Sequence, residues 1–282
     1  VMTAIMLAAV CLGAGAGFPA GTPIPFTDGS GPLFSYMPGP APSRSYVPEV
    51  FTPSGVNVAR DNVADHIHHH GLMMAFKVDG TDFWSEVPEG GKQVRTALEK
   101  RADGLVENLD WTAPDGTVLL KETRTLRASR QDGHTLLDWT SEFSLPAGRD
   151  TAVITGSHYH GLGMRFIKQM DTQGPFFNES GRDGELIRGD ERNTRADWCA
   201  YTAEIKGKPV TAAMFDHPDN FRPATWFTMS QGFAYLSATV NVWRDPLTLS
   251  KDAPLKLRYA VALWDGKTPP EAVAAAWANW TK

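Results

Sequence analysis

The chain has 282 residues, and its 27 lysine and arginine residues stand against 32 aspartate and glutamate residues, giving a formal net charge of -5. This acidic balance argues against nucleic acid and anionic membrane surfaces as partners. Hydrophobic residues make up 42% of the sequence, enough for one large core. We therefore expect a single domain over residues 43–282, because all-β domains of this size are commonly undivided.

The first 17 residues form an apolar run that ends in Ala14-Gly15-Ala16, a pattern typical of a secretory signal and its cleavage site. The charged region that usually precedes such a run is missing. A lipoprotein anchor at Cys11 is an alternative, although Val10 stands where a small residue is expected. The run is shorter than the ~20 residues that a spanning helix needs. We predict no membrane span and an exported bacterial protein, either periplasmic or secreted. Cys199 is then expected to be a small buried residue without a disulfide partner.

Residues 18–42 are rich in Gly and Pro and predict an extended lead-in that crosses a surface before the core begins. Alternating apolar and polar residues then indicate strands, most clearly over residues 137–145 and 255–263. Further strand candidates are residues 46–52, 72–78, 93–101, 105–112, 118–127, 162–168, 201–205, 210–215 and 233–239. This pattern predicts an all-β fold, an antiparallel β-sandwich.

One helix is predicted near the C-terminus. Thr268 is in place for an N-cap, Pro269 for the first helical position and Glu271 for a capping box, and residues 272–280 are strong helix formers. We expect Val273 and Trp277 to pack against the sandwich. Residues 174–193 have little periodicity and predict a long loop, of the kind that often forms a lid or a rim.

The most unusual stretch is Asp65-His66-Ile67-His68-His69-His70-Gly71-Leu72, which holds four of the eight histidines. Imidazoles can donate a proton, accept a proton or bind a metal ion near pH 7, so His66, His68 and His69 are candidate catalytic residues. If the stretch is extended, His66, His68 and His70 share one face and His69 lies on the other. The alternative is a solvated polar loop or one or two structural histidines.

A second pair of histidines occurs in Ser157-His158-Tyr159-His160-Gly161. An H-x-H pair on a strand can present two imidazoles to one metal ion. His68, His70, His158 and His160 are therefore candidate ligands of a divalent metal ion, either as four nitrogens or as three nitrogens plus water. The spacing permits this site but does not require it.

The third stretch is Asp216-His217-Pro218-Asp219-Asn220-Phe221-Arg222-Pro223, followed by Trp226-Phe227. His217 is a further candidate catalytic residue, and Asn220, Arg222 and Trp226 suit a polyhydroxylated ligand. The alternative is a capped turn in which Asp216 or Asp219 accepts bonds from backbone amides. Arg60 and Asp61 either contact the substrate, orient the imidazoles or pair with each other.

Several of these blocks resemble the bacterial PmoA-like family, whose members are labelled methane oxygenase. The resemblance rests on Arg60-Asp61 with Asp65-His66-x-His68-His69-x-Gly71-Leu72, on Asp82-Phe83-Trp84, on Asp216 to Pro223 with Trp226, and on Leu257-x-Tyr259 to Asp265-Gly266. His70 stands where many relatives have Arg, and the pair His158 and His160 is not a family block. The resemblance adds Trp84 to the candidate substrate-binding residues. It implies a fold similar to galactose-mutarotase-like sandwiches and a link to carbohydrate catabolism, rather than methane chemistry in a membrane.

These observations favour an exported carbohydrate-active enzyme that acts by proton transfer on a sugar or keto-sugar, as a lyase, epimerase or hydrolase. One of His66, His68 or His69 would abstract a proton, His217 would protonate the leaving oxygen, and Arg222 or a metal would stabilise an enolate. The partner would be a small-molecule or oligosaccharide substrate. A sugar-binding protein without catalysis and a metal-dependent oxygenase are the alternatives.

Overall fold

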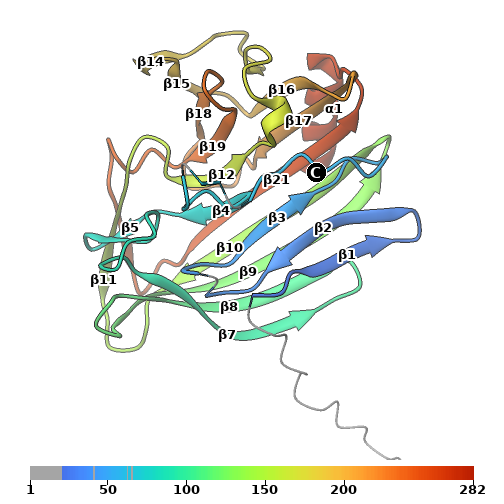
Figure 1. The fold of residues 1–282 in the computed structure, drawn as a ribbon. Coiled ribbons are helices and arrows are strands. Elements are labelled where there is room, and N and C mark those ends of the chain that lie inside the picture. Colours follow the sequence, from blue (N-terminus) through green and yellow to red (C-terminus); the bar gives the residue numbers. More distant parts are fainter. Residues whose placement is uncertain (1–20, 41, 62, 65) are drawn as a thin grey trace, which may run out of the picture.

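The computed structural model describes residues 21–40, 42–61, 63–64 and 66–282. The signal-like segment over residues 1–17, with Cys11, lies outside the described residues. Two large antiparallel sheets form the body of the molecule, and Figure 1 shows β1–β3 and β7–β10 as long curved strands in two layers. Within the described residues, no helix is long and apolar enough to cross a membrane.

The first sheet has nine strands, and every neighbouring pair is antiparallel. In spatial order they are β1 (Ile24–Asp28), β2 (Gly31–Met37), β3 (Tyr46–Val50), β4 (Leu72–Ala75), β12 (Gly161–Arg165), β19 (Tyr235–Thr239), β18 (Thr225–Met229), β15 (Glu191–Arg195) and β14 (Glu185–Arg188).

The second sheet has eight strands, and a third, smaller sheet has four. The eight are β13 (Phe177–Asn178), β16 (Trp198–Ile205), β17 (Lys208–Asp216), β21 (Leu255–Asp265), β10 (His134–Ser144), β9 (Val118–Gln131), β8 (Gly104–Thr112) and β7 (Lys92–Lys100). The four are β20 (Leu247–Ser250), β11 (Thr151–Thr155), β5 (Lys77–Val78) and β6 (Thr81–Asp82). A short 3-10 helix η1 (Lys168–Met170) and the helix α1 (Pro270–Trp280) complete the elements. The predicted antiparallel β-sandwich with a short C-terminal helix is confirmed.

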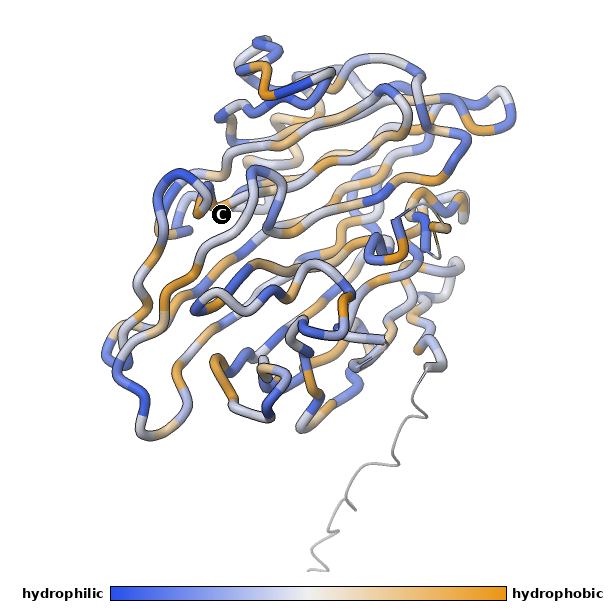
Figure 2. Tube along the Cα trace, turned by 60° about the vertical axis from the view of Figure 1, so that its left-hand side comes forward, coloured by the Kyte–Doolittle hydropathy of each residue, from blue (hydrophilic) through white to orange (hydrophobic). Residues whose placement is uncertain are grey.

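The two clearest predicted strands alternate because their apolar residues are buried and most of the polar residues between them are more exposed. In β10, Trp139 and Phe143 are fully buried, whereas Glu142 and Ser144 are exposed to solvent. β10 pairs with β21, so Trp139 lies opposite Tyr259 in the core. Figure 2 shows the resulting alternation of hydrophobic and hydrophilic residues along the strands.

A buried polar network joins the two large sheets. The Arg124 guanidinium on β9 donates to both carboxylate oxygens of Glu122, at 2.9 Å each, and to the carbonyl of Ser45, at 3.0 Å. Tyr36 on β2 donates to the Glu107 carboxylate on β8. Arg124 and Tyr36 are both completely buried. Such a network stabilises the core only while each charged group keeps its partners.

The predicted start of the domain at residue 43 is wrong. Residues of the expected lead-in form β1 and β2, and Phe26, Phe34 and Tyr36 are buried in the core. The Gly and Pro residues concealed this pairing, because Pro25, Gly31 and Pro32 lie within the two strands themselves. Phe26 and Phe34 stack with ring centroids 4.4 Å apart, so the hairpin is held by its own aromatic residues.

Two further expectations need correction. Residues 174–193 do not form one long loop, since β13 and β14 lie within them and β15 begins in them. The N-cap of α1 is Pro269 rather than Thr268, and it makes no side-chain capping bond. The Thr268 N–H instead donates to Thr211 Oγ1 at 3.0 Å. Val273, on α1, is buried against the eight-stranded sheet as expected. Cys199 is also buried, as predicted.

Candidate functional site

The candidate site lies on one face of the nine-stranded sheet. Phe227 on β18 pairs with Ser237 on β19, and Ser237 pairs with Gly163 on β12. In the next row, Met229 pairs with Tyr235 and Tyr235 with Arg165. Directly paired residues share a face of the sheet, and so do residues two positions apart. The register therefore places Phe227, Met229 and Tyr235 on a common surface.

Loops close over this surface and leave a pocket of about 450 Å³. Its walls combine imidazoles, aromatic rings, one methionine and one arginine with one glutamate. The lining residues are His66, His68, His69, Tyr159, Arg188, Glu191, Phe227, Met229, Phe233 and Tyr235. A mostly apolar pocket with a few converging polar groups is the usual form of a small-molecule site.

The three imidazoles come together because the histidine stretch is a turn and not a strand. The His69 N–H donates to the His66 carbonyl at 2.8 Å. The ring centroids of His69 lie 4.8 Å from those of His66 and 4.7 Å from those of His68, and His66 and His68 are 5.9 Å apart. The predicted division by strand faces is therefore wrong. His66, His68 and His69 line the pocket, and His70 does not.

The pocket imidazoles have unusually low basicity. Burial, followed by the charges of Arg44 and His66, lowers the pKa of His68 to about 4. Burial, followed by His68 and His66, lowers the pKa of His69 to about 2. Desolvation disfavours the charged imidazolium, and crowded imidazoles repel one another when protonated. At neutral pH these two rings are therefore neutral, and each presents one ring nitrogen as a hydrogen-bond donor and the other as an acceptor.

Glu191 brings an ionised carboxylate to the same pocket. Its Oε2 accepts bonds from His158 Nε2 and from Arg188 Nε, both at 2.8 Å. Burial opposes ionisation, but the bonds from Arg188 and His158 outweigh it and lower the pKa of Glu191. Sequence reasoning missed Glu191 and Arg188, because they lie in the segment that was expected to be an irregular loop.

Tyr235 is the buried phenol of the site. Its ring stacks on His69, with centroids 5.0 Å apart, and its hydroxyl has no hydrogen-bond partner within the described residues. Burial raises the pKa of Tyr235, so the hydroxyl keeps its proton. A Cβ atom at Gly163 would stand 1.8 Å from that hydroxyl, which explains why glycine occupies this position.

His70 points away from the pocket into a clamp of two carboxylates. Its Nδ1 lies 2.7 Å from Asp61 Oδ1, and its Nε2 lies 3.0 Å from Glu86 Oε1. Both nitrogens face carboxylate oxygens, so both carry protons and the ring is an imidazolium. Burial opposes this charge, but the bonds to Asp61 and Glu86 raise the pKa of His70. The ring also stacks on Tyr46, with centroids 4.4 Å apart. We interpret the clamp as structural.

The four predicted metal ligands do not form a shared site. His70 is committed to Asp61 and Glu86, and His158 is bonded to Glu191. His160 is buried and stacks on Trp84, with centroids 4.7 Å apart. In the part of the chain that the structure describes, no group of three or more His, Cys, Asp or Glu side chains is arranged to hold a metal ion. These residues therefore do not fit the metal that the H-x-H spacing suggested.

The stretch from Asp216 to Arg222 forms the capped turn that was the alternative interpretation. Asn220 Nδ2 donates to Asp216 Oδ1 at 2.6 Å, and Asp216 Oδ2 accepts from the Ala224 N–H at 2.8 Å. The Arg258 N–H donates to Asn220 Oδ1 at 2.7 Å. His217 lies against α1, 5.2 Å from the Trp280 ring, and bonds to Arg258 at 2.8 Å. None of these residues lines the pocket.

The other predicted substrate-binding residues also lie outside the pocket lining. Trp226 is fully buried on the opposite face of β18, where its Nε1 donates to the Ala196 carbonyl at 2.7 Å. Arg222 donates to the carbonyls of Val240 and Asp245, at 3.2 and 2.9 Å. Hydrogen bonds to backbone carbonyls therefore account for both side chains.

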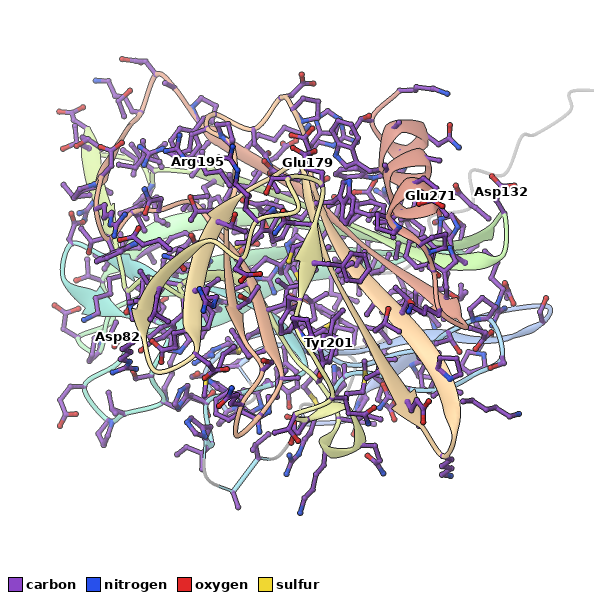
Figure 3. All side chains as sticks on the ribbon, turned by 90° about the horizontal axis from the view of Figure 1, so that it is seen from above. Asp82, Asp132, Glu179, Arg195, Tyr201 and Glu271 are labelled. Atoms are coloured by element: carbon purple, nitrogen blue, oxygen red, sulfur yellow. The ribbon has the colours of Figure 1, made fainter. Side chains whose placement is uncertain are left out.

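Arg60 and Trp84 support the walls around the pocket. Arg60 pairs with Asp171 at 3.8 Å, and Trp84 is 1% exposed between the rings of His160 and Tyr159. The Trp84 backbone N–H donates to Asp82 Oδ1 at 2.7 Å, and this bond holds the start of the loop that follows β6. Figure 3 shows Asp82 on the opposite side of the molecule from Asp132, which lies in the β9–β10 turn.

Comparisons with solved structures give only distant similarities. Alpha-galactosidases AgaB and AgaA of family GH36 from Geobacillus stearothermophilus match with 10% and 9% identity and TM-scores of 0.41 and 0.39, over 86% of this chain and 32% of theirs. The 4-alpha-glucanotransferase from Thermococcus litoralis matches with 8% identity and a TM-score of 0.38, over 86% of this chain and 39% of that one. This chain thus spans well under half the length of these proteins.

A comparison with curated proteins found no match. A family model covers residues 24–278, which include all the residues that line the pocket. The chain therefore belongs to the family of unknown function DUF6807.

Proposed function

We propose that this protein is a carbohydrate-active enzyme that transfers protons to and from a sugar or keto-sugar. The observation that carries the proposal is the group of three imidazoles, His66, His68 and His69, in a pocket with aromatic walls. Aromatic rings such as Tyr159 and Phe233 offer apolar faces to the C–H side of a sugar ring. An imidazole beside that face can remove a proton from carbon or oxygen while its acceptor nitrogen is unprotonated.

The residues can be given roles in such a reaction. One of His66, His68 and His69 would take the proton from the carbon next to a carbonyl group, and the C–H electron pair would move to give an enolate. In an epimerase the proton would return to the other face of that carbon. In a lyase the enolate would collapse and expel a β-oxygen, which would take a proton from the Tyr235 hydroxyl. Arg188, which is 70% exposed at the pocket edge, would face the developing negative charge.

The pocket favours proton transfer over hydrolysis by paired carboxylates. Glycosidases of the usual type need two carboxyl groups on either side of the scissile bond. Among the described residues that line the pocket, Glu191 supplies one carboxylate and no second one accompanies it. The lyase and epimerase versions of the predicted activity are therefore preferred to the hydrolase version.

A sugar-binding protein without catalysis is the second candidate. It is favoured by the number of aromatic residues in the pocket, since Tyr159, Phe227, Phe233 and Tyr235 suffice to hold a ring. The relation to the PmoA-like family, an oxygenase activity and export to the periplasm or medium stay predictions from the sequence.

The experiment is a turnover assay with glycosides, uronates and 3-keto-glycosides, followed by product analysis. We expect one class to be converted, and His68→Ala to lower kcat by about 10²–10⁴ because a general base is lost. His134→Gln is the matched control, since His134 lies on β10 and outside the pocket lining. Tight binding of a sugar with no product would establish the second candidate. Unchanged turnover in His68→Ala would contradict the assigned role.

A further inference from the structure

A fully buried arginine contacts the loops around the pocket, and the proposed reaction gives it no role. Arg44 is in the segment between β2 and β3, it is 0% exposed, and it is not among the residues that line the pocket. Arginine stays protonated in proteins, so Arg44 is a fixed positive charge. Burying a charge is costly unless protein groups compensate it. The partners of Arg44 therefore show what it holds in place.

The Arg44 guanidinium joins the histidine turn to the loop that carries Trp84. Its Nη1 donates to the backbone carbonyl of His68 at 3.1 Å, and its Nη2 donates to the backbone carbonyl of Trp84. The His68 side chain lines the pocket, and the Trp84 ring lies against the His69 ring, with centroids 6.5 Å apart. Arg44 thus holds the turn by its backbone, while the imidazoles of the turn line the pocket.

A chain of alternating charges fixes the position of Arg44 itself. Its Nη2 lies 3.6 Å from Glu86 Oε1, and the same oxygen accepts from Ser43 Oγ at 2.7 Å. His70 Nε2 lies 3.0 Å from this oxygen, and the other ring nitrogen of His70 lies 2.7 Å from Asp61 Oδ1. Two cations and two carboxylates alternate along this chain, so its charges balance. The guanidinium therefore has one defined place beside the turn.

The charge of Arg44 acts on groups inside the pocket. Burial, and then the charge of Arg44, lowers the pKa of His68 to about 4. Burial raises the pKa of Tyr235, and the charge of Arg44 is the first influence that opposes this rise. A nearby cation disfavours an imidazolium and favours a phenolate. Both effects favour negative charge in the pocket, and an enolate is a negative charge.

We infer that Arg44 is a positioning residue of the proposed active site, which orients the histidine turn through the His68 carbonyl and supplies a fixed positive charge that favours the enolate. Arg44 does this without touching the sugar. The inference rests on the proposed function, and it adds to that site a residue from a segment distant in sequence from the histidines.

The test compares the turnover of Arg44→Lys and Arg44→Met with that of the wild-type protein, on the uronate or 3-keto-glycoside that the wild-type protein converts. Lysine keeps the charge but cannot reproduce the fork that spans two carbonyls. We expect kcat per folded molecule to fall about 10-fold in Arg44→Lys and about 100-fold in Arg44→Met, with little change in KM. Arg44→Lys decides the test where Arg44→Met does not fold.

Arg124→Lys is the matched control. Arg124 is also completely buried, but its partners Glu122 and Ser45 are outside the pocket lining. This variant should lower the Tm and leave kcat per folded molecule unchanged. An unchanged kcat in Arg44→Lys, or an equal fall in Arg124→Lys, would overturn the inference and leave the proposed function intact.

A second measurement does not depend on turnover. NMR titration of the His68 ring, over the pH range in which the chain is folded, follows the pKa of His68. This pKa should rise in Arg44→Met, because a cation that disfavours the imidazolium is removed, and it should stay low in Arg44→Lys. An unchanged pKa in Arg44→Met would overturn the inference. Absence of turnover by the wild-type protein on every sugar would instead remove the proposed function, and the inference with it.

Discussion

The His69 imidazole stacks on the Tyr235 phenol with ring centroids 5.0 Å apart and planes 25° from parallel. This contact joins the histidine turn to β19, and so it fixes the three imidazoles over the sheet. The neutral base and the phenol proton donor are therefore held as one unit. The predictions below test this unit, its surroundings and the core that supports it.

Gly163→Ala should displace the Tyr235 side chain from its position in the site. The added methyl group would stand 1.8 Å from the Tyr235 hydroxyl, so the phenol must move and its stacking on His69 must change. Overpacking of this kind costs about 1–3 kcal/mol of unfolding free energy. We expect loss of sugar binding or turnover together with a lowered Tm. Gly29→Ala is the control, because a Cβ atom there meets nothing within 4 Å. Equal behaviour of the two variants would contradict the prediction.

Acid should destabilise the fold through the buried neutral imidazoles. The pKa of His160 is lowered to about 3 and that of His69 to about 2, from an ordinary value of 6.5, chiefly by burial. Between pH 6.5 and those values the unfolded chain binds protons that the folded chain does not, so stability falls as the pH falls. Each such group contributes a slope of ~1.4 kcal/mol per pH unit. Urea unfolding at pH 7, 6 and 5 should show this slope, and His160→Gln should reduce it. An unchanged slope in the variant would refute the assignment.

Alkali should weaken the structure through His70. Its folded pKa is raised because Asp61 and Glu86 bond to its two nitrogens, against the opposing effect of burial. A raised pKa gives stability that is complete below the unfolded value of 6.5 and is lost as the pH rises through the folded value. His70→Gln has no titrating ring and should remove this alkaline loss. The measurement is the unfolding free energy from pH 6 to pH 9, and an identical profile in the variant would count against the clamp.

Because Arg124 and Glu122 form a buried ion pair, replacing Arg124 should strongly lower the free energy of unfolding. Arg124→Met would leave Glu122 without its bidentate partner in a fully buried position. Breaking such a pair costs about 3–5 kcal/mol. The double variant Glu122→Gln with Arg124→Met should recover part of that loss, since the Glu122 charge that Arg124 compensated is then removed as well. Chemical denaturation measures both, and additive losses in the double variant would contradict this coupling.

Much of the fold was predictable because strand signals depend on local alternation. Trp139 and Phe143 alternate with polar residues over a whole strand, and β10 was found where expected. β14 and β15 were missed because they are short strands at the end of the sheet with several charges, among them Arg188 and Glu191. β15 is held by pairing to β18, whose residues are 30 or more positions away in the sequence.

The sequence predicted the site residues correctly only where several reactive side chains are close together in one stretch of the chain. His66, His68 and His69 are adjacent in sequence, and the structure brings them into one pocket. His217 belongs to an equally polar stretch, but its neighbours are satisfied locally by a capped turn. Tyr235 could not be identified, because its position depends on the register of β12, β18 and β19.

The most direct test of the central claim is deuterium exchange into sugars in heavy water. An epimerase that removes a proton beside a carbonyl group and returns one from solvent introduces deuterium at that carbon, whereas a lyase leaves that carbon in a new C=C bond. We predict that the wild-type protein introduces deuterium at that carbon in a keto-sugar, as seen by NMR, and that His69→Gln lowers the rate by at least 100-fold. Absence of both deuterium exchange and an unsaturated product with every bound keto-sugar and uronate would contradict proton transfer and leave sugar binding as the function.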